Sequence, residues 1–221
     1  MTGTGTEVGK TVVAAAIAHT LAAEGKRVAV FKPAVTGLEE SPADRPDHVA
    51  LREAAGSTQS DDEIAPYRYG PAMSPHLAAE LAGEEVESTR LLTAARTAAT
   101  GADALVCEGV GGLLVPLSSD YLIRDLAVDL ALPLVVAASP GLGTINHTLL
   151  TLEAARSAEL DVAAVVLTPW PDKPTEVECS NRETIAALGE VEVETLPWLE
   201  PADTSGWPSL DGWRFLPAMR E

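Results

Sequence analysis

The sequence contains the stretch Gly3-Thr4-Gly5-Thr6-Glu7-Val8-Gly9-Lys10-Thr11, which runs directly into the apolar segment 12–17. Glycines let successive backbone N–H groups converge on one anion, and a lysine adds positive charge for the outer phosphates. The threonine hydroxyl that follows is suited to hold a magnesium ion at a helix N-terminus. The stretch therefore predicts a phosphate-binding loop and, with it, a nucleoside triphosphate as ligand.

The spacing and the setting of this loop both depart from the common form of the motif. Counted from Gly3, the pattern is Gly-x5-Gly-Lys-Thr, one residue longer than usual, whereas counting from Gly5 makes it one residue shorter. A phosphate loop normally follows a buried strand, yet only Met1 and Thr2 precede Gly3. We therefore expect the first strand to be missing or truncated, through a late start or a shortened chain, which would leave its neighbours unpaired.

Length, composition and charge limit the possible classes of protein. The chain has 221 residues, 46% of them apolar, which is enough for one full core, so residues 1–221 are expected to form a single domain. Residues 200–221 show no clear periodicity and are interpreted as a C-terminal tail. A net charge of −18 opposes binding to nucleic acid or to an anionic membrane surface. Anionic ligands must therefore be held by locally placed positive charge.

Targeting and redox signals indicate a cytoplasmic protein. No apolar run approaches the roughly 20 residues of a membrane span, and the first residues do not start a signal peptide. Cys107 and Cys179 have neither metal-binding spacing nor a disulfide framework, so both are interpreted as reduced thiols.

Helical and strand patterns alternate along the chain, which is typical of a parallel sheet covered by helices on both faces. A helix is expected over residues 9–24, and a capping-box pattern at 180–183 predicts the start of a late helix. Buried strands are predicted at residues 27–31, 104–107, 134–138 and 162–167. Together these elements predict a three-layer α/β fold of the P-loop NTPase type, with a mostly parallel sheet.

Ligands of such sheets bind beyond the carboxyl ends of the strands, so polar residues there are candidates for the site. Lys32 can stabilise charge on a transferring phosphoryl group, although a lysine that merely leaves a strand would look the same. Glu108 enters the glycine-rich stretch 108–112 and suits magnesium coordination; the alternative is a solvated strand end. Asp47 opens a helical segment, where an N-cap role is the ordinary explanation and metal contact the more specific one.

Two further segments carry possible binding groups. Residues 141–147 precede a predicted helix, so their N–H groups are suited to a carboxylate, although a tight strand-to-helix turn needs the same glycines. The tryptophans lie between Trp170 and Trp213, where core packing is the common explanation, but Pro197-Trp198-Leu199 can form one wall of a base pocket. The histidines form no recognisable ligand pair and are interpreted as structural or solvated.

The order of these motifs resembles that of the dethiobiotin synthetases, the family that catalyses the penultimate step of biotin synthesis. The similarity extends from the first residues to about residue 200, and the combination is more specific than any single motif. The longer glycine loop is the form that this family uses. The matching segments are, in order, 3–11, Phe31-Lys32-Pro33 with Thr36-Gly37, 108–113, 142–147 and Leu196-Pro197-Trp198-Leu199.

The resemblance implies an ATP-dependent ligase that converts 7,8-diaminononanoate and CO2 or bicarbonate into dethiobiotin, ADP and phosphate, with Mg2+ as cofactor. In the family, one amine of the substrate is first carbamated, and the carbamate oxygen attacks the γ-phosphate. The second amine then displaces phosphate from the mixed anhydride and closes the cyclic urea. Such chemistry needs positioning and charge neutralisation, which two lysines, a magnesium ion and a backbone cradle supply.

The resemblance also implies roles for individual residues. Lys32 matches the catalytic lysine, and Lys10 and Thr6 would line the reacting phosphate and carbamate. Thr11, Asp47 and Glu108 match the magnesium site. Further nucleotide contacts would come from Glu7, Val8, Gly9, Lys10, Thr11, Val12, Gly109, Val110, Gly111, Thr168, Pro169, Pro197, Trp198 and Leu199. The diamine substrate would be bound by Thr36 and, from the neighbouring subunit of a homodimer, by Gly143, Thr144, Ile145 and Asn146.

The sequence departs from the family pattern at one position, and two other classes of protein share some of its features. Many family members place Asn-Asp after the fourth strand to recognise adenine, whereas this chain has Thr168-Pro169, so other triphosphates are expected to replace ATP. A partner-switched ATPase of the partitioning and iron-protein type shares long phosphate loops, but it usually has an extra lysine early in the loop, and residues 4–7 contain none. An amidotransferase-linked cobyrinate synthase is a third possibility, but the chain has no room for a glutaminase domain.

Overall fold

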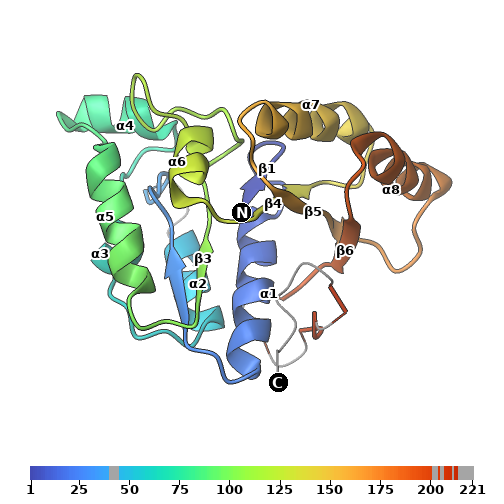
Figure 1. Cartoon of the computed structure of the whole chain (residues 1–221), viewed down its shortest axis with the longest axis horizontal. Coiled ribbons are helices and arrows are strands. Elements are labelled where there is room, and N and C mark those ends of the chain that lie inside the picture. The colour runs from blue at the N-terminus through green and yellow to red at the C-terminus, as the bar shows by residue number, and fades with distance from the viewer. Residues whose placement is uncertain (40–44, 201–203, 205–206, 211, 214–221) are drawn as a thin grey trace.

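The computed structural model describes residues 1–39, 45–200, 204, 207–210 and 212–213. In this part of the chain, helices and strands alternate as the sequence predicts (Figure 1). The strands are β1 (Thr2–Gly3), β2 (Val28–Phe31), β3 (Ala104–Cys107), β4 (Leu134–Ala138), β5 (Val162–Trp170) and β6 (Val193–Pro197), and the helices are α1 (Lys10–Ala23), α2 (Asp47–Ala54), α3 (Asp61–Ile64), α4 (Pro75–Ala82), α5 (Ser88–Ala99), α6 (Ile123–Leu130), α7 (Thr144–Arg156) and α8 (Glu176–Gly189).

The pairings between these strands are all parallel. β2 pairs with β3, while β1, β4, β5 and β6 follow one another in a second ladder. Met1 joins the two ladders, because its amino nitrogen donates to the carbonyl of Cys107 at 2.6 Å and its own carbonyl accepts from Gly109 N at 2.9 Å. The short strand β1 therefore lies in the middle of the molecule, between β3 and β4 (Figure 1).

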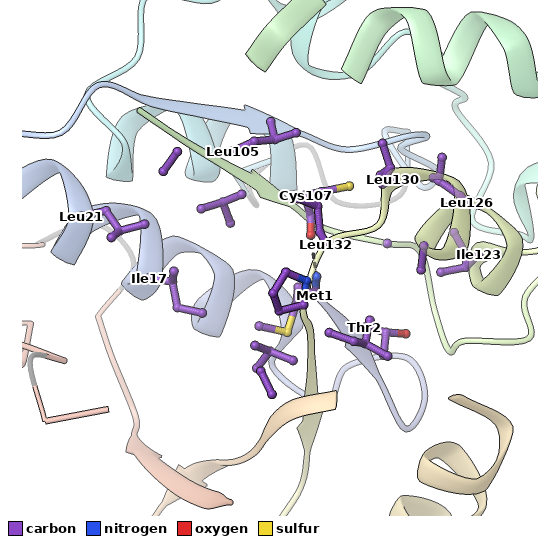
Figure 2. Close-up of a pocket in the computed structure, with 18 of the residues that line it drawn as sticks. Met1, Thr2, Ile17, Leu21, Leu105, Cys107, Ile123, Leu126, Leu130 and Leu132 are labelled. Atoms are coloured by element: carbon purple, nitrogen blue, oxygen red, sulfur yellow. Dashed lines mark hydrogen bonds between the residues drawn. The ribbon is translucent and has the colours of Figure 1, made fainter. Parts of the chain in front are cut away.

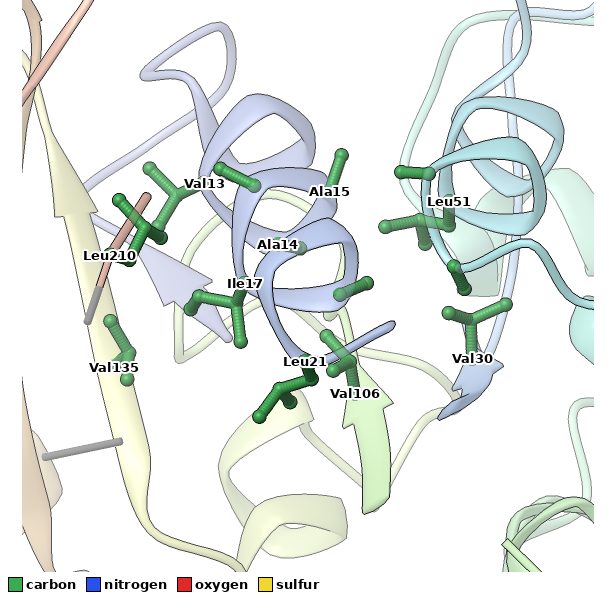
Figure 3. Packing of buried hydrophobic residues seen from close by; sticks show 14 of the residues in the cluster. Val13, Ala14, Ala15, Ile17, Leu21, Val30, Leu51, Val106, Val135 and Leu210 are labelled. Carbon is green, nitrogen blue, oxygen red and sulfur yellow. The ribbon is translucent and has the colours of Figure 1, made fainter. Parts of the chain in front are cut away.

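The side chains of β4 alternate between the two faces of the sheet, as expected for a strand buried on both sides. Val135 and Ala137 pack in the core cluster built around α1 and α2, part of which is drawn in Figure 3. Val136 and Ala138 belong to a different cluster, which contains residues of α7 and α8 such as Leu152. Helices thus cover both faces of a parallel sheet, and the predicted three-layer P-loop NTPase fold is confirmed.

Helix α1 forms the centre of the first of these clusters. Its residues 13–18 are all buried, and most of them are small, so the helix lies close to the sheet. Part of the predicted C-terminal tail also packs here: Leu210 and Trp213 are buried in the same cluster. The ring of Trp207 meets that of His19 edge-on, with 5.6 Å between the ring centroids. These described residues of the tail therefore contribute to the core.

Helix α8 begins earlier than predicted. Its N-cap is Thr175, whose hydroxyl accepts from Glu178 N at 3.3 Å while the Glu178 carboxylate accepts from Thr175 N at 2.7 Å. The capping box predicted at 180–183 is therefore wrong, because this segment lies inside the helix. Among the helices in the described ranges, none combines the length and the apolar character that crossing a bilayer requires.

Candidate active site

The predicted phosphate loop connects β1 to α1 and is held at both ends by backbone hydrogen bonds. Thr4 N donates to Ala137 O of β4 at 3.0 Å, and Gly9 O accepts from Val13 N at 3.0 Å. Gly9 has a φ of 85°, and a Cβ atom at this position would lie 2.4 Å from the methyl group of Thr168. Glycine is therefore required at position 9 for both its backbone conformation and its contact with the end of β5.

Lys10 stabilises the phosphate loop through a hydrogen bond to the loop backbone. Its ammonium group donates to the carbonyl of Gly5 at 2.8 Å, and the side chain is mostly buried. Burial lowers the pKa of Lys10, and the nearby Glu108 carboxylate opposes this shift. Thr6 and Glu7, in contrast, are exposed at the outer side of the loop. The loop thus has the buried ammonium group of Lys10 on its inner side and the exposed residues Thr6 and Glu7 on its outer side.

Lys32 and Glu108 lie just beyond the carboxyl ends of the neighbouring strands β2 and β3, and their side chains meet. Lys32 Nζ lies 2.7 Å from Glu108 Oε1 and 2.6 Å from Asp47 Oδ2. The Thr11 hydroxyl lies 2.9 Å from Asp47 Oδ1 and 2.8 Å from Glu108 Oε1. The side chains of Lys32 and Glu108 are 3% and 0% exposed, whereas that of Asp47 is 43% exposed. We call Lys32, Glu108, Asp47 and Thr11 the Lys32 cluster.

The charges of the Lys32 cluster depend on one another. Burial alone would lower the pKa of Lys32, but the carboxylates of Glu108 and Asp47 outweigh it and raise this pKa. Burial raises the pKa of Glu108, and Lys32 offsets only part of that increase. Desolvation would also raise the pKa of Asp47, but attraction to Lys32 lowers it below the usual range. Lys32 therefore carries its positive charge beside the phosphate loop, in a place that water reaches poorly.

The oxygen atoms of the Lys32 cluster fit a magnesium ion. Glu108 Oε2 is buried and has no hydrogen-bond partner among the described residues, a costly situation that a cation would relieve. The Thr11 hydroxyl has a single proton for the two carboxylate oxygens that it faces. No group of three or more His, Cys, Asp or Glu side chains in the described ranges is placed to hold a metal. A magnesium ion here would rely on two carboxylates, one hydroxyl and oxygen atoms from its ligand.

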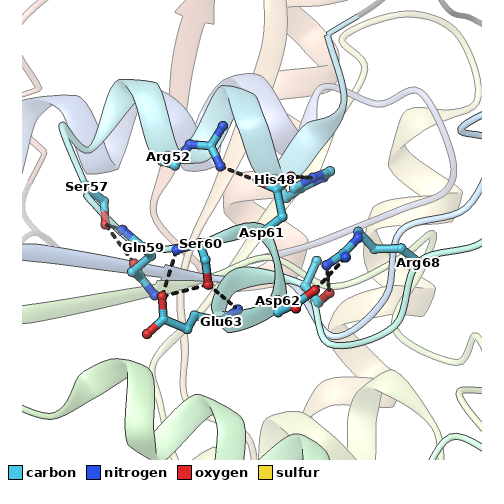
Figure 4. A network of polar contacts seen from close by, with 10 residues as sticks. His48, Arg52, Ser57, Gln59, Ser60, Asp61, Asp62, Glu63 and Arg68 are labelled. Atoms are coloured by element: carbon cyan, nitrogen blue, oxygen red, sulfur yellow. Dashed lines mark hydrogen bonds and ion pairs between the residues drawn. The ribbon is translucent and has the colours of Figure 1, made fainter.

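Asp47 reaches the cluster from the first turn of α2. The N-cap position is taken by Pro46, so the structure does not give Asp47 the capping role that sequence alone favours. A polar network joins α2 to α3 (Figure 4): Arg52 of α2 pairs with Asp61 of α3, and His48 Nε2 lies 3.7 Å from the same carboxylate. These contacts join α2 to α3, and the Asp47 carboxylate itself is held by Lys32 and Thr11.

The glycine-rich segment after β3 lies against the start of the phosphate loop. A Cβ atom at Gly112 would lie 3.4 Å from the carbonyl of Gly3, and Gly109 N donates to Met1 O. Of the predicted nucleotide contacts, Gly109 therefore lies beside Met1, and Val110 and Gly111 lie between it and Gly112 in the sequence. Thr36 follows β2 four positions after Lys32 and is half-buried.

The predicted base-pocket residues lie in the last part of β5, which extends to Trp170 rather than ending at residue 167 as predicted, and around the end of β6. Thr168 is buried against Gly9, and Pro169 is exposed. Trp198 is 65% exposed, and Pro197 beside it is also exposed, so both are accessible to a ligand. Leu199, in contrast, is buried in the core cluster around α1. Among the predicted base-pocket residues, Trp198 is therefore the aromatic side chain that a ligand can reach.

The glycine turn before α7 is held by a residue that no sequence motif marks as part of a site. Asn181, buried on α8, donates to the carbonyls of Pro140 at 2.9 Å and Gly141 at 3.1 Å. Gly143 follows with a φ of 93° and precedes the first residue of α7. No hydrogen bond or ion pair between described residues joins this turn, which carries Gly143, Thr144, Ile145 and Asn146, to the Lys32 cluster of the same chain.

Comparison with known proteins gives consistent results. A family model described as an AAA domain matches residues 1–204. The chain is 40% identical over 199 residues to the ATP-dependent dethiobiotin synthetase BioD of Anaeromyxobacter dehalogenans (strain 2CP-1 / ATCC BAA-258), covering 90% of this chain and 88% of that protein. It is 35% identical over 188 residues to the protein of the same name from Bacillus subtilis (strain 168), covering 85% and 81%.

Among solved structures, the chain is similar to the cell division ATPase MinD of Pyrococcus furiosus. The TM-score is 0.51 and the sequences are 16% identical, with 89% of this chain and 81% of that chain covered. At this identity the similarity concerns the fold alone. The relatives at 35–40% identity are far closer in sequence and match the chain over most of its length. The chain belongs to the family of ATP-dependent dethiobiotin synthetases.

Proposed function

We propose that this protein closes the ureido ring of dethiobiotin from 7,8-diaminononanoate and CO2 with ATP, in a magnesium-dependent reaction. The observation that carries the proposal is the position of Lys32, a buried ammonium group held between Asp47 and Glu108 beside the phosphate loop. Phosphoryl transfer is accelerated chiefly by positioning and by positive charge where negative charge develops. A family name shared with relatives at 35–40% identity supports this assignment.

The proposed reaction has three steps. One amine of the diamine attacks CO2 and loses a proton, which gives a carbamate. A carbamate oxygen then attacks the γ-phosphorus of ATP, the bond to the bridging oxygen breaks, and ADP leaves. The second amine finally attacks the carbamoyl carbon, expels phosphate and loses a proton, which closes the urea.

The residues of this chain have distinct parts in these steps. The backbone of residues 4–9 and Lys10 bind the phosphates of ATP, and Lys32 neutralises charge on the group in transfer. Thr11, Asp47 and Glu108 hold Mg2+, which when bound offsets the negative charge of the phosphates. Because the positive charges are fixed before the reaction, little reorganisation is needed when the carbamate attacks.

The simplest test of the proposal is an omission experiment. ADP release should require the diamine, bicarbonate and Mg2+ together, and dethiobiotin should accumulate in equal amount. The alternative function is a partner-switched ATPase, a class that shares the long phosphate loop and the parallel sheet. ATP hydrolysis that ignores the diamine and responds only to a protein or DNA partner would favour that function instead.

The turn before α7 is proposed to bind the substrate carboxylate through backbone N–H groups, in the site of the neighbouring subunit of a homodimer. Replacing Asn181 with alanine removes the two hydrogen bonds that hold this turn. We expect the KM for the diamine to rise about tenfold, with the KM for ATP unchanged, because losing such bonds costs about 1–3 kcal/mol. Initial rates at varied diamine and varied ATP measure the two constants.

Ser180→Ala is the matched control for Asn181→Ala, since Ser180 is an exposed neighbour on the same helix. It should leave both constants unchanged. An equal rise in the two KM values, or a loss of activity that follows a fall in Tm, would contradict a specific role for the turn.

Nucleotide selectivity is expected to be weak. At the end of β5, Thr168 is buried against Gly9, and Pro169 has no side-chain hydrogen-bond donor. Without an amide or carboxylate side chain at this position to recognise adenine, CTP or GTP should support turnover within about tenfold of ATP. Rates of dethiobiotin formation with the three triphosphates test this expectation, and strict dependence on ATP would contradict it.

A further inference from the structure

Lys32 and Glu108 follow two strands, β2 and β3, which pair with each other and have different surroundings on their other sides. On the side of β3 away from β2, residues 104–107 line a mainly apolar cavity of about 430 Å³ next to Met1 (Figure 2). None of the Lys32 cluster lines this cavity. On the side of β2 away from β3, no further strand follows in the described ranges, yet the backbone there is hydrogen-bonded to residues 59–69.

The side chain of Gln59 takes the place of a neighbouring strand beside β2. Its Oε1 atom accepts from Val30 N at 2.9 Å, and its Nε2 atom donates to Val30 O at 3.1 Å. A neighbouring strand would satisfy the same two groups through its backbone. Among side chains, only the amides of asparagine and glutamine combine a carbonyl and an N–H donor on one planar group, as a peptide does. Gln59 therefore satisfies the outer groups of Val30, a residue that is 0% exposed.

Local hydrogen bonds hold the Gln59 amide in this orientation. The Ser57 hydroxyl donates to Gln59 Oε1 at 2.9 Å and accepts from Gln59 N at 3.3 Å. In Figure 4 this pair lies beside the capping box of α3, in which Ser60 N donates to Glu63 Oε2 at 2.7 Å and Glu63 N donates to Ser60 Oγ at 3.4 Å. The amide is thus oriented before it meets β2, which lowers the entropic cost of its two hydrogen bonds.

The same segment also holds the backbone of Lys32. Lys32 follows Val30 by two positions, and its N–H donates to Ile64 O, at the end of α3, at 2.8 Å. Beyond Lys32, Val35 N donates to Tyr67 O at 2.9 Å. The chain is therefore tied to one segment before, at and after Lys32, and Gln59 makes the first of these ties.

The ammonium group of Lys32 depends on the relative position of β2 and β3. It is buried and lies 2.6 Å from Asp47 Oδ2 and 2.7 Å from Glu108 Oε1. Glu108 is itself placed by the ladder, since its N–H donates to Phe31 O at 2.8 Å. A shift of β2 would move Lys32 relative to the phosphate loop, and a misplacement of about 1 Å in an active site lowers a rate by about 10²-fold.

We propose that Gln59 is a positioning residue for Lys32: its side-chain amide holds the outer edge of β2, so that the Lys32 ammonium group meets the phosphoryl group in transfer. This role rests on the proposed function, in which Lys32 neutralises charge on that group. The amide itself is required, because a side chain without a donor leaves Val30 O unpaired, and an apolar side chain leaves Val30 N unpaired as well.

Two substitutions of Gln59 test this role in the whole chain. Gln59→Leu removes both hydrogen bonds to Val30, and Gln59→Glu keeps the acceptor but loses the donor. We expect each to lower kcat for dethiobiotin formation about tenfold, with the KM for ATP unchanged, because the phosphate loop is not altered. Thr58→Ala, at an exposed neighbour, is the matched control and should change neither constant. A kcat within about twofold of the original in both variants would overturn the proposal.

A double-mutant cycle separates positioning of Lys32 from a general loss of structure. If Gln59 acts through Lys32, Gln59→Leu should change kcat by less than about twofold in a chain that already carries Lys32→Met. A further tenfold loss in that chain would overturn the proposal.

Hydrogen exchange tests the same role without any activity. The amide of Lys32 should exchange at least about tenfold faster in Gln59→Leu, whereas that of Val165 in β5 should not change. Equal exchange of the Lys32 amide in the two proteins would overturn the proposal. If the unsubstituted chain forms no dethiobiotin, the proposed function fails, and the exchange of the Lys32 amide still decides whether Gln59 holds β2.

Discussion

Replacing Lys32 with methionine is expected to lower kcat for dethiobiotin formation by about 10³-fold. A loss of this size is found when an enzyme loses one preorganised hydrogen-bond donor that stabilises the transition state. The ammonium group is the only part of the side chain that the change deletes, since methionine fills a similar volume. The KM for ATP should change little, because the loop and Lys10 still bind the nucleotide. Steady-state rates at saturating diamine, bicarbonate and ATP provide the measurement.

The change also leaves Glu108 buried without its cationic partner, so a fall in stability must be separated from a fall in catalysis. Tm and equilibrium binding of ATP, measured on the same preparation, make that separation. Lys26→Met is the matched control, because Lys26 precedes the same strand but pairs only with the nearby Glu24 among the ion pairs of the described residues. A Lys32→Met protein that binds ATP and keeps its rate within about threefold would refute the catalytic role.

Replacing Glu108 with glutamine is expected to lower kcat by about 10²-fold and to raise the Mg2+ concentration for half-maximal activity by at least tenfold. Glutamine keeps an oxygen that can accept from Lys32 and Thr11, but it lacks the second carboxylate oxygen that is buried without a partner. Because the variant leaves the buried Lys32 with Asp47 as its remaining carboxylate partner, a fall in stability is expected, and Tm measured on the same preparation separates it from the fall in activity. Rates over a Mg2+ titration at fixed ATP measure both effects.

Glu153→Gln on the exposed side of α7 serves as the control, and it should leave the Mg2+ titration unchanged. If Glu108→Gln lowers kcat without shifting the Mg2+ dependence, Glu108 acts on Lys32 rather than on the metal. An unchanged kcat together with an unchanged Mg2+ dependence would remove Glu108 from the site.

Much of the fold and part of the site could be predicted because both follow from local patterns. Short apolar runs separated by helical periodicity predict a parallel sheet, and the carboxyl ends of parallel strands meet at one edge. That geometry brings Lys32 and Glu108 together although 76 positions separate them in the chain. The phosphate loop is equally local, since its glycines, Lys10 and Thr11 are contiguous.

Features that depend on contacts between distant segments could not be predicted in the same way. A helix cap is the local explanation of Asp47, but its side chain pairs with Lys32, which lies on a different element. Asn181 appeared to lie in a capping box, whereas the structure uses it inside α8 to hold a turn on another element. A more favourable cap, Thr175 with Glu178, was present in the sequence. Leu210 shows no periodic neighbours, yet it completes the core.

The proposed mechanism makes the carbamate oxygen the atom that attacks ATP, and isotope transfer tests this claim most directly. With ¹⁸O-labelled bicarbonate, rapid quenching and mass spectrometry of both products, one labelled oxygen should appear in the released phosphate and one in the ureido carbonyl of dethiobiotin. The first oxygen leaves with phosphorus when the second amine expels phosphate, and the other stays on carbon. Two results would contradict the account. One is the release of unlabelled phosphate together with dethiobiotin whose ureido carbonyl is labelled, and the other is the release of unlabelled phosphate when no dethiobiotin forms.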